Sequence, residues 1–231
     1  MNELSPRLGA IAALVPPGSR LTDVGTDHAL LPAHLRLAGI CPRVIATDLR
    51  EQPLLRGREN ARRLGAEGID FRLCDGLEGL RPGEADVIVI AGMGGETIAH
   101  ILAHAPWYDW AGITLILQPM SSMPDLRAWL GKNGYAILEE RLAREGDVLY
   151  TALSVRAGEM PPMTAAERYA GRNTRDPLRG AWLERWLART ERALTGLAQA
   201  RRTEDRARKE ELEQVRAGLL EMKKEWENWQ R

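Results

Sequence analysis

The sequence predicts an α/β fold, a sheet covered by helices, followed by a purely helical part. Short β-rich runs alternate with amphipathic stretches over residues 1–157, which is typical of a mostly parallel sheet. Glycine and proline punctuate these runs, for example at residues 16–18. Beyond Gly158 no β-like run occurs and helix-forming residues dominate. We therefore expect two domains, residues 1–158 and residues 159–231.

The elements of the first domain follow from these runs in order. Strand-like segments rich in Val, Ile, Leu and Thr are each followed by a segment with helical spacing of apolar residues. The expected strands are residues 20–24, 43–48, 69–74, 86–90 and 114–118, and the expected helices are residues 30–38, 52–64, 95–104 and 123–133. Two further strand-like runs, residues 135–142 and 147–155, flank the turn sequence A-R-E-G. They predict a terminal antiparallel hairpin that closes the sheet.

The second domain begins with the linker sequence E-M-P-P-M. Apolar residues then recur at three- and four-residue spacing, as at Leu183 and Leu187 and again at Leu212, Val215 and Leu219, with Thr203 as the expected N-cap between the two stripes. Such stripes indicate a packed core rather than a cofactor site. We expect a short helix over residues 165–170 and then two long antiparallel helices that pack like a coiled coil.

Composition limits the class of protein. The chain carries 32 Lys and Arg against 32 Asp and Glu, a balance that does not favour a generic nucleic-acid binder. Residues 161–231 hold 16 of the basic and 12 of the acidic residues, so a polyanion would bind there more readily, although a solvated helical surface would look the same. With two cysteines, no secretory signal and no apolar run near the ~20 residues of a membrane span, we expect a cytoplasmic protein with reduced thiols.

Polar residues follow the expected strands at the edge where open α/β sheets bind ligands. The first strand runs into D-V-G-T-D-H, residues 23–28. A bound NAD would need G-x-G-x-x-G there, so that bare backbone could approach its pyrophosphate. The loop offers one glycine, Gly25, and then the carboxylate of Asp27, which would repel a diphosphate. This loop argues against a dinucleotide.

A cofactor with a cationic amino-acid end suits the same loop, and S-adenosylmethionine (SAM) has one. Asp23 or Asp27 can accept charge-assisted hydrogen bonds from its ammonium group, and Gly25 lets the backbone pass close to it. Each aspartate taken singly is also typical of a turn or a helix N-cap. Their succession at strand ends favours the cofactor.

The next two strands end in further candidates. Asp48, with Leu49 beside it, is placed to bind the ribose hydroxyls, as acidic residues do at this position for other nucleosides. Asp75 can accept from the adenine amine, and Gly76 leaves room for the ring.

The fourth strand is followed by G-M-G-G, residues 92–95, where amino-methylating enzymes commonly carry a D-P-P-Y type motif. We interpret it as a loop with few side chains that opens a helix and lets a substrate edge approach; a tight turn with Met93 packed on the sheet is the alternative. His100 and His104 have the i,i+4 spacing of a metal pair. Since no H-E-x-x-H motif or cysteine cluster accompanies them, we expect no metal.

The chain resembles the bacterial tRNA (adenine22-N1)-methyltransferase family. The resemblance covers almost the whole chain and rests on L-S-P-R-L at 4–8, D-V-G-T-D-H-A-L-L-P at 23–32, C-D-G-L at 74–77, I-A-G-M-G-G at 90–95 and L-I-L-Q-P at 115–119. It implies a Rossmann-like class I methyltransferase domain followed by a helical domain. It also implies methyl transfer from SAM to N1 of an adenine in the D-arm region of tRNA.

The resemblance also implies roles for residues. SAM would be bound by Gly25, Asp27, Asp48, Asp75 and Gly76. Gly92 and Met93 would border the methyl donor and the target base, and the candidates for the substrate side are Arg7, Gly94, Gln118 and Pro119.

The implied reaction needs no obligatory general base, because N1 of adenine has a free in-plane lone pair once the base is unpaired. The catalytic candidates Asp27 and His28 would orient the adenine or offset the positive charge of the product. Basic side chains of the helical domain could meet phosphates: Arg172, Arg175, Arg179, Arg201, Arg202 and Lys209. We expect a monomer with tRNA as partner and no membrane contact.

The sequence leaves two rival functions open. One is a class I methyltransferase that acts on a small molecule or a protein, which would transfer nothing to RNA. The other is a non-enzymatic pairing module with a vestigial pocket, which would not bind SAM.

Overall fold

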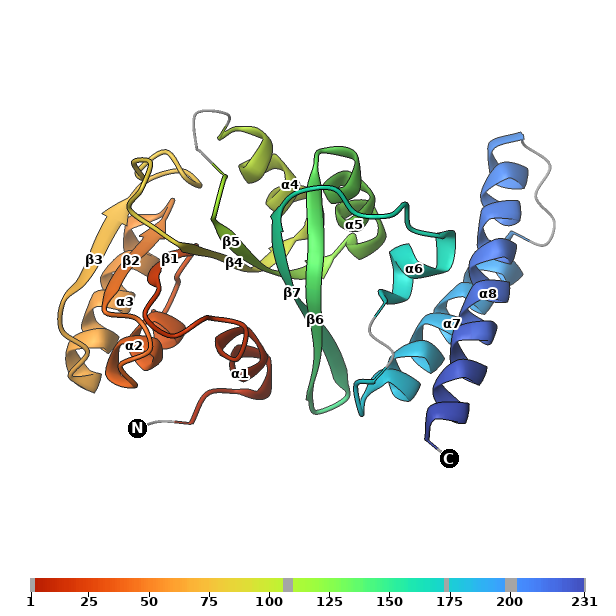
Figure 1. Ribbon diagram of the computed structural model, residues 1–231, viewed down its shortest axis with the longest axis horizontal. Helices are drawn as coiled ribbons and strands as arrows, with labels where there is room; N and C mark the ends of the chain where they lie inside the picture. Colours follow the sequence, from red (N-terminus) through yellow and green to blue (C-terminus); the bar gives the residue numbers. More distant parts are fainter. Residues whose placement is uncertain (1–2, 106–109, 173–174, 198–202, 231) are drawn as a thin grey trace.

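The computed structural model describes residues 3–105, 110–172, 175–197 and 203–230 (Figure 1). Its strands are β1 (Arg20–Val24), β2 (Arg43–Asp48), β3 (Ile69–Leu73), β4 (Val87–Gly94), β5 (Thr114–Ser121), β6 (Tyr135–Glu145) and β7 (Val148–Ala157). Its helices are α1 (Pro6–Ala12), α2 (Leu30–Leu37), α3 (Glu51–Leu64), α4 (Gly95–Ala103), α5 (Met123–Lys132), α6 (Ala165–Ala170), α7 (Arg179–Gly196) and α8 (Thr203–Trp229).

The strands form one seven-stranded sheet in the order β3-β2-β1-β4-β5-β7-β6. The first five strands are parallel, β7 is antiparallel to β5, and β6 is antiparallel to β7. The predicted α/β class and the terminal antiparallel hairpin are confirmed. Because strand order reverses between β1 and β4, the carboxyl ends of these two strands border the position where such sheets bind ligands.

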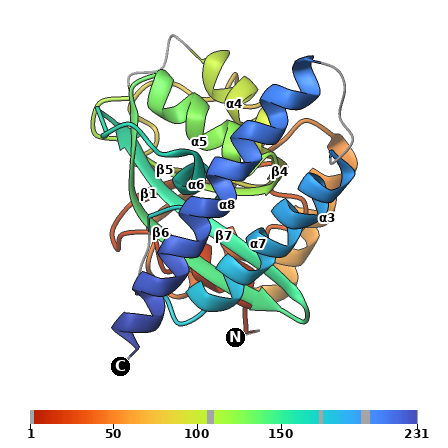
Figure 2. The same ribbon diagram turned by 90° about the vertical axis from the view of Figure 1, so that its right-hand side faces the viewer.

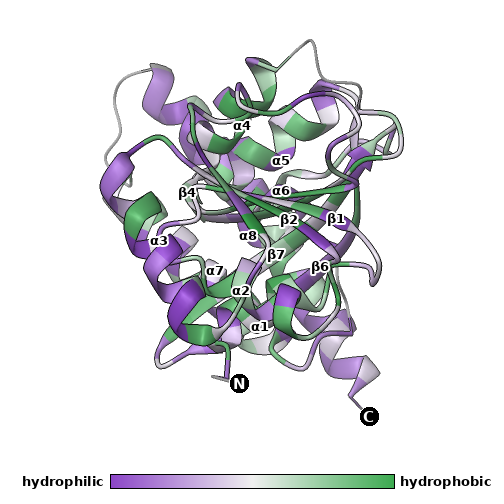
Figure 3. Ribbon diagram, turned by 90° about the vertical axis from the view of Figure 1, so that its left-hand side faces the viewer, coloured by the Kyte–Doolittle hydropathy of each residue, from purple (hydrophilic) through white to green (hydrophobic). Residues whose placement is uncertain are grey.

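Helices cover both faces of the sheet (Figure 1). Alternating strand residues point to opposite faces, so Val87 and Val89 join the core beneath α1 and α2, whereas Ile88 and Ile90 join the core beneath α4 and α5. Figure 3 shows apolar residues concentrated on the strands between the helical layers and polar residues on the outer side of α3. Both faces of the central strands are therefore buried, which explains the continuous apolar runs of β4 and β5, whereas the edge strand β3, I-D-F-R-L, alternates and contains no fully buried residue.

The helical part packs against the sheet face that α4 and α5 also cover. One apolar cluster runs from Leu153 of β7 through Ala166 of α6 to Leu183 of α7 and Leu219 of α8. α7 and α8 lie side by side and run in opposite directions (Figure 2). Near the start of α7, Glu184 Oε1 lies 3.0 Å from Lys223 Nζ near the end of α8. The predicted antiparallel pair is present; its coiled-coil character and the domain boundary at residue 158 stay predictions.

Three boundaries differ from the sequence-based expectation. α1 was not predicted, although the Ser5 hydroxyl accepts a hydrogen bond from the N–H of Leu8 and Pro6 occupies the first turn, both typical of a helix start. β6 continues to Glu145, which pairs with Val148, so the hairpin turns at residues 146–147 and, of A-R-E-G, only Gly146 lies in the turn. β4 continues through Gly94, so G-M-G is strand rather than loop.

No helix in the described ranges is long and apolar enough to cross a membrane.

Candidate cofactor and substrate site

The end of β1 carries a buried carboxylate. Asp23 is 6% exposed, and Asp48, equally buried, ends the neighbouring strand β2. Burial and, to a smaller degree, the negative charge of Asp48 raise the pKa of Asp23 to about 7, against a hydrogen bond with the Thr26 side chain that lowers it. No ion pair joins Asp23 to a basic side chain in the part of the chain that the structure describes. A cationic ligand would supply the missing partner.

Gly25 brings the backbone close to this carboxylate. Its φ of +72° is in the left-handed region, and its N–H donates to the carbonyl of Thr47 over 2.8 Å. A Cβ at this position would overlap the methyl carbon Cε of Met93. The site therefore requires glycine both for its backbone conformation and for the space that Met93 fills.

Asp27 and His28 lie at the rim of the same loop, and both are exposed. Asp27 has a φ of +46°. Its carboxylate lies 3.4 Å from His28 Nε2 and 3.5 Å from Arg56 Nη2. Arg56 of α3 is a neighbour that sequence reasoning missed, because only the fold brings α3 to this loop.

Six of the predicted site residues line one cavity of about 290 Å³. They are Arg7, Asp23, Gly25, Asp27, His28 and Gly92. The cavity also includes residues that were not predicted: Leu8, Thr26, Leu30, Leu31, Ala91 and Met120. Both candidate catalytic residues therefore share a cavity with the buried carboxylate of Asp23.

The predicted ribose and adenine residues lie beside this cavity rather than in its lining. Asp48 Oδ1 accepts from the N–H of Arg50 over 2.9 Å, while the Asp48 carbonyl accepts from Cys74 over 3.0 Å. The loops after β2 and β3 are thus adjacent. Leu49 and Asp75 are exposed there, and a Cβ at Gly76 would lie 3.2 Å from Ile101 of α4.

Gln118 joins three elements around the cavity. Its Oε1 accepts from Arg7 Nη1 over 2.9 Å and from the N–H of Gly92 over 3.2 Å, and its Nε2 donates to the Pro119 carbonyl over 3.0 Å. The side chain is fully buried. Gln118 therefore fixes the positions of Arg7 and Gly92, and its predicted contact with substrate stays a prediction.

The interpretation of G-M-G as a loop is wrong. Met93 pairs with Pro119 and Gly94 with Ser121, with register shifts on either side of Met93, so this segment is irregular strand. A Cβ at Gly94 would lie 3.1 Å from Ser121 Oγ. The close approach of β5 thus explains the small residue here, and contact of Gly94 and Pro119 with substrate remains untested.

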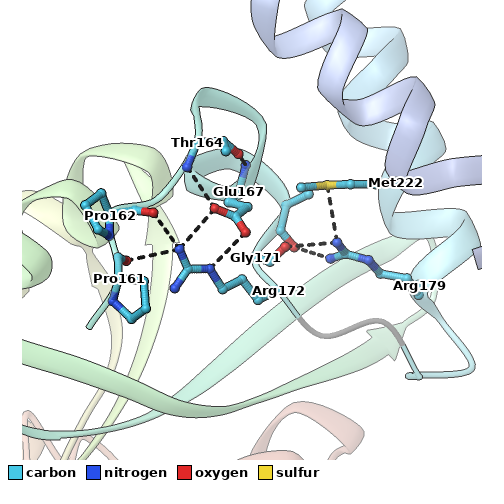
Figure 4. Close-up of polar contacts among 9 residues, drawn as sticks. Pro161, Pro162, Thr164, Glu167, Gly171, Arg172, Arg179 and Met222 are labelled. Atoms are coloured by element: carbon cyan, nitrogen blue, oxygen red, sulfur yellow. Dashed lines mark hydrogen bonds and ion pairs between the residues drawn. The ribbon is translucent and has the colours of Figure 1, made fainter. Parts of the chain in front are cut away.

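The basic residues of the helical part differ from expectation. Arg179 is buried and donates to the carbonyl of Ala170 and, as Figure 4 shows, to that of Gly171. The prediction that it contacts phosphate is therefore wrong. Arg172 donates to Glu167 and to the carbonyls of residues 161 and 162. Arg175 is exposed and Lys209 is partly exposed, and their contact with phosphate stays a prediction. Arg201 and Arg202 lie outside the described residues.

The two histidines of the i,i+4 pair lie at the C-terminal end of α4 and contact each other. The rings of His100 and His104 lie 3.9 Å apart, and His104 Nδ1 lies 2.9 Å from the His100 carbonyl. Over residues 3–105, 110–172, 175–197 and 203–230, no group of three or more His, Cys, Asp and Glu could hold a metal ion.

Comparison with known proteins assigns the family. A family described as a methyltransferase domain matches residues 4–153. The tRNA (adenine(22)-N(1))-methyltransferase of Bacillus subtilis strain 168 is 38% identical over 162 residues, which is 69% of this chain and 68% of that protein. The chain belongs to the tRNA (adenine22-N1)-methyltransferase family.

Solved structures of similar proteins agree with this family. The crystal structure of the m1A22 tRNA methyltransferase TrmK of B. subtilis has a TM-score of 0.82 at 30% identity and covers 96% of this chain and 99% of its own. Sp1610 of Streptococcus pneumoniae, solved in complex with SAM, has a TM-score of 0.75 at 30% identity, with 98% and 99% covered. The chain is therefore a class I methyltransferase with SAM as its cofactor.

The residues present fit that cofactor. Asp23 is a buried carboxylate that lacks a cationic partner among the described residues, and SAM carries an ammonium group. Gly25 leaves the backbone bare beside it, and Asp48 ends the next strand. The rival interpretation of a non-enzymatic module is wrong for a member of the tRNA (adenine22-N1)-methyltransferase family.

Proposed function

We propose that the chain transfers a methyl group from SAM to N1 of adenine 22 in the D-arm region of tRNA. The observation that carries this proposal is the shared cavity. It joins the buried carboxylate of Asp23, at its inner end, to the exposed Asp27 and His28 at its rim. The family to which the chain belongs methylates this position, and almost the whole chain superposes on its solved members.

The chain's own residues divide into cofactor and substrate groups. When bound, SAM supplies a methyl group on a positively charged sulfur. In the proposal Asp23 and Asp27 accept from its ammonium group, Asp48 and Leu49 hold the ribose, Asp75 and Gly76 border the adenine, and Gly92 and Met93 flank the methyl donor. The substrate base enters from the side of Arg7, Gly94, Gln118 and Pro119.

No residue of the site needs to remove a proton from the adenine. N1 has an in-plane lone pair, so methylation there creates a positive charge and releases no proton beforehand. Asp27 stabilises that developing charge, and His28, 3.4 Å away, orients the Asp27 carboxylate. Position and alignment of the base supply most of the rate, and a base in folded RNA must leave its stack to reach the cavity.

The enzyme acts as a monomer in the cytoplasm, where its tRNA substrate is found, and it uses no metal. Residues 1–158 hold SAM, and residues 159–231 form the helical domain.

The test is transfer of isotopically labelled methyl from SAM to unmodified tRNA transcripts, followed by nucleoside digestion and mass spectrometry. Labelled 1-methyladenosine that disappears when adenine 22 is replaced by guanine establishes the reaction and its target. SAM binding without any label in RNA would keep the cofactor and move the substrate to a small molecule or a protein.

A further inference from the structure

A second groove, of about 400 Å³, lies between the end of β5, the strand β7 and helices α6–α8. Pro119 and Met120 line it from β5, and Met120 also lines the 290 Å³ cofactor cavity. The groove and the cavity therefore share a wall at the carboxyl end of β5. Figure 2 views the molecule from the side on which α7 and α8 lie.

The groove carries an excess of positive charge. Four arginines line it, Arg168, Arg185, Arg189 and Arg208, against two acidic residues, Asp125 and Glu211. Glu211 accepts from both Arg168, over 3.2 Å, and Arg208, over 2.6 Å. A single carboxylate thus fixes two guanidinium groups and neutralises only one of their charges.

The other two arginines of the groove have N–H donors that no carboxylate of the described residues accepts. Arg185 and Arg189 are four residues apart on α7 and both are exposed. Arg185 Nη1 lies 3.5 Å from the Leu149 carbonyl, and Arg189 Cζ lies 5.4 Å from the centre of the Trp186 ring. In the described part of the chain neither is paired with a carboxylate. Guanidinium groups in this state are suited to phosphate oxygens.

An aromatic residue connects the groove to the cavity. Tyr150 lines the groove, and the guanidinium of Arg7, which lines the cavity, lies 5.8 Å from the centre of the Tyr150 ring. Single-stranded nucleic acids bind to surfaces that combine aromatic faces for bases with a basic track for the backbone. Tyr150 provides the aromatic ring where the groove meets the cavity, and the arginines of α7 provide the basic track along the groove.

We propose that this groove binds the tRNA strand that continues from the methylated adenine, with Arg185 and Arg189 contacting its phosphates and Tyr150 packing against the adjoining nucleotide. This inference rests on the proposed function and deepens it, because it names the surface that holds the RNA. It places the phosphate contacts on the groove face of α7 and removes Arg179 from that role.

The experiment compares two double variants of the full chain. Arg185→Ala/Arg189→Ala removes the groove charges, and Arg192→Ala/Arg216→Ala removes two exposed charges from α7 and α8 outside the groove. Binding of an unmodified tRNA transcript is measured by fluorescence anisotropy at several salt concentrations, and SAM binding by calorimetry. The groove variant should bind tRNA at least about tenfold more weakly, with its log K versus log salt slope reduced by about one per lost phosphate contact.

The control variant should stay within about twofold of wild type, and SAM affinity should be unchanged in both, since neither pair lines the cofactor cavity. Arg185→Lys/Arg189→Lys should restore a large part of the tRNA affinity, which a merely misfolded variant would not. Equal tRNA binding by the groove and control variants, with methylation by wild type intact, would overturn the inference and leave the proposed function standing. Absence of methylation by wild type is the separate failure of the proposed function. Competition by polyglutamate as strong as by tRNA would assign the groove to an acidic protein instead.

Discussion

Arg127 Nη2 lies 2.7 Å from Glu140 Oε2, and both side chains are buried, that of Arg127 completely. The second terminal nitrogen of Arg127 donates to the carbonyls of Arg168 and Tyr169, each over 2.9 Å. The ion pair thus connects α5 and β6 to the last turn of α6. A Cβ at Gly171 would overlap the Glu140 carboxylate, so this glycine lets α6 end against the pair. The helical part is therefore attached to the sheet by buried charge as well as by apolar packing.

Removal of one partner of the Arg127–Glu140 ion pair should lower the stability of the protein. Glu140→Ala leaves the guanidinium of Arg127 buried without a counter-charge, and we expect the free energy of unfolding to fall by about 3–5 kcal/mol. Urea denaturation of the full chain measures it. Glu139→Ala is the matched control, because it removes an exposed partner of Arg141 and should cost no more than about 1 kcal/mol. A similar small loss for both variants would show that the buried pair contributes little.

Stability should decrease as pH rises toward neutrality, because of Asp23. Its pKa of about 7 in the folded protein exceeds the ordinary 3.8, so the folded state retains a proton that the unfolded chain has already released. This contribution is complete below about pH 4 and is lost as pH rises to 7. Between pH 5 and 7 the loss is roughly 1.4 kcal/mol per pH unit at most. Carboxylates with lowered pKa, such as Glu84, act in the opposite direction but at lower pH.

Thermal melting at pH 5, 6, 7 and 8 measures this dependence, with Asp23→Asn as the comparison. The variant cannot ionise at this position, so the difference in melting temperature between variant and wild type should widen in favour of the variant as pH rises. A difference that stays constant from pH 5 to 8 would mean that Asp23 titrates in its ordinary range.

Gly25→Ala should abolish SAM binding and reduce stability. The new Cβ meets Met93 Cε, and the backbone has a φ of +72°. Gly18→Ala is the control for the strain of alanine at a positive φ, because Gly18 has a φ of +83° and a Cβ added there would have no neighbour within 4 Å. We expect about 1 kcal/mol for Gly18→Ala and at least twice that for Gly25→Ala. Calorimetry measures SAM binding, and urea denaturation measures the free energy of unfolding. Intact SAM affinity in Gly25→Ala would contradict the assignment of this loop to the cofactor.

The strands and helices could be predicted where apolar periodicity is strong. It marks the five parallel strands and helices α2–α5, because the core dictates the residues of the buried central strands and of the inner face of each helix. The ends of β4 and β6 could not be predicted, since glycine and charged residues there read as breakers while pairing with β5 and β7 keeps them extended. Partner strands far away in the sequence decide such ends.

The position of the cavity was predictable from the sequence, whereas the burial of individual arginines was not. The rule that ligands bind at the carboxyl ends of strands located Asp23, Gly25 and Asp27, which do share a cavity. It could not distinguish exposed arginines from buried ones: Arg179 reads as surface charge, yet carbonyls at the end of α6 satisfy it in the interior. The groove beside Met120 also escaped prediction, because residues 119–125 and the arginines of α6, α7 and α8 meet only in the folded chain.

Gln118→Leu tests whether a buried amide positions the substrate side of the cavity. The variant removes the acceptor of Arg7 and of the Gly92 N–H, so both groups lose the atom that fixes them. Because Gln118 is fully buried and does not line the cavity, we expect SAM affinity within about twofold of wild type. The kcat for tRNA methylation should fall about tenfold or more, the scale on which small misplacements act. Gln52→Leu, on the exposed face of α3, is the control. If Gln118→Glu restores the kcat that Gln118→Leu lowers, the acceptor oxygen is the atom that positions the site. An unchanged kcat in Gln118→Leu would show that Arg7 and Gly92 keep their working positions without Gln118.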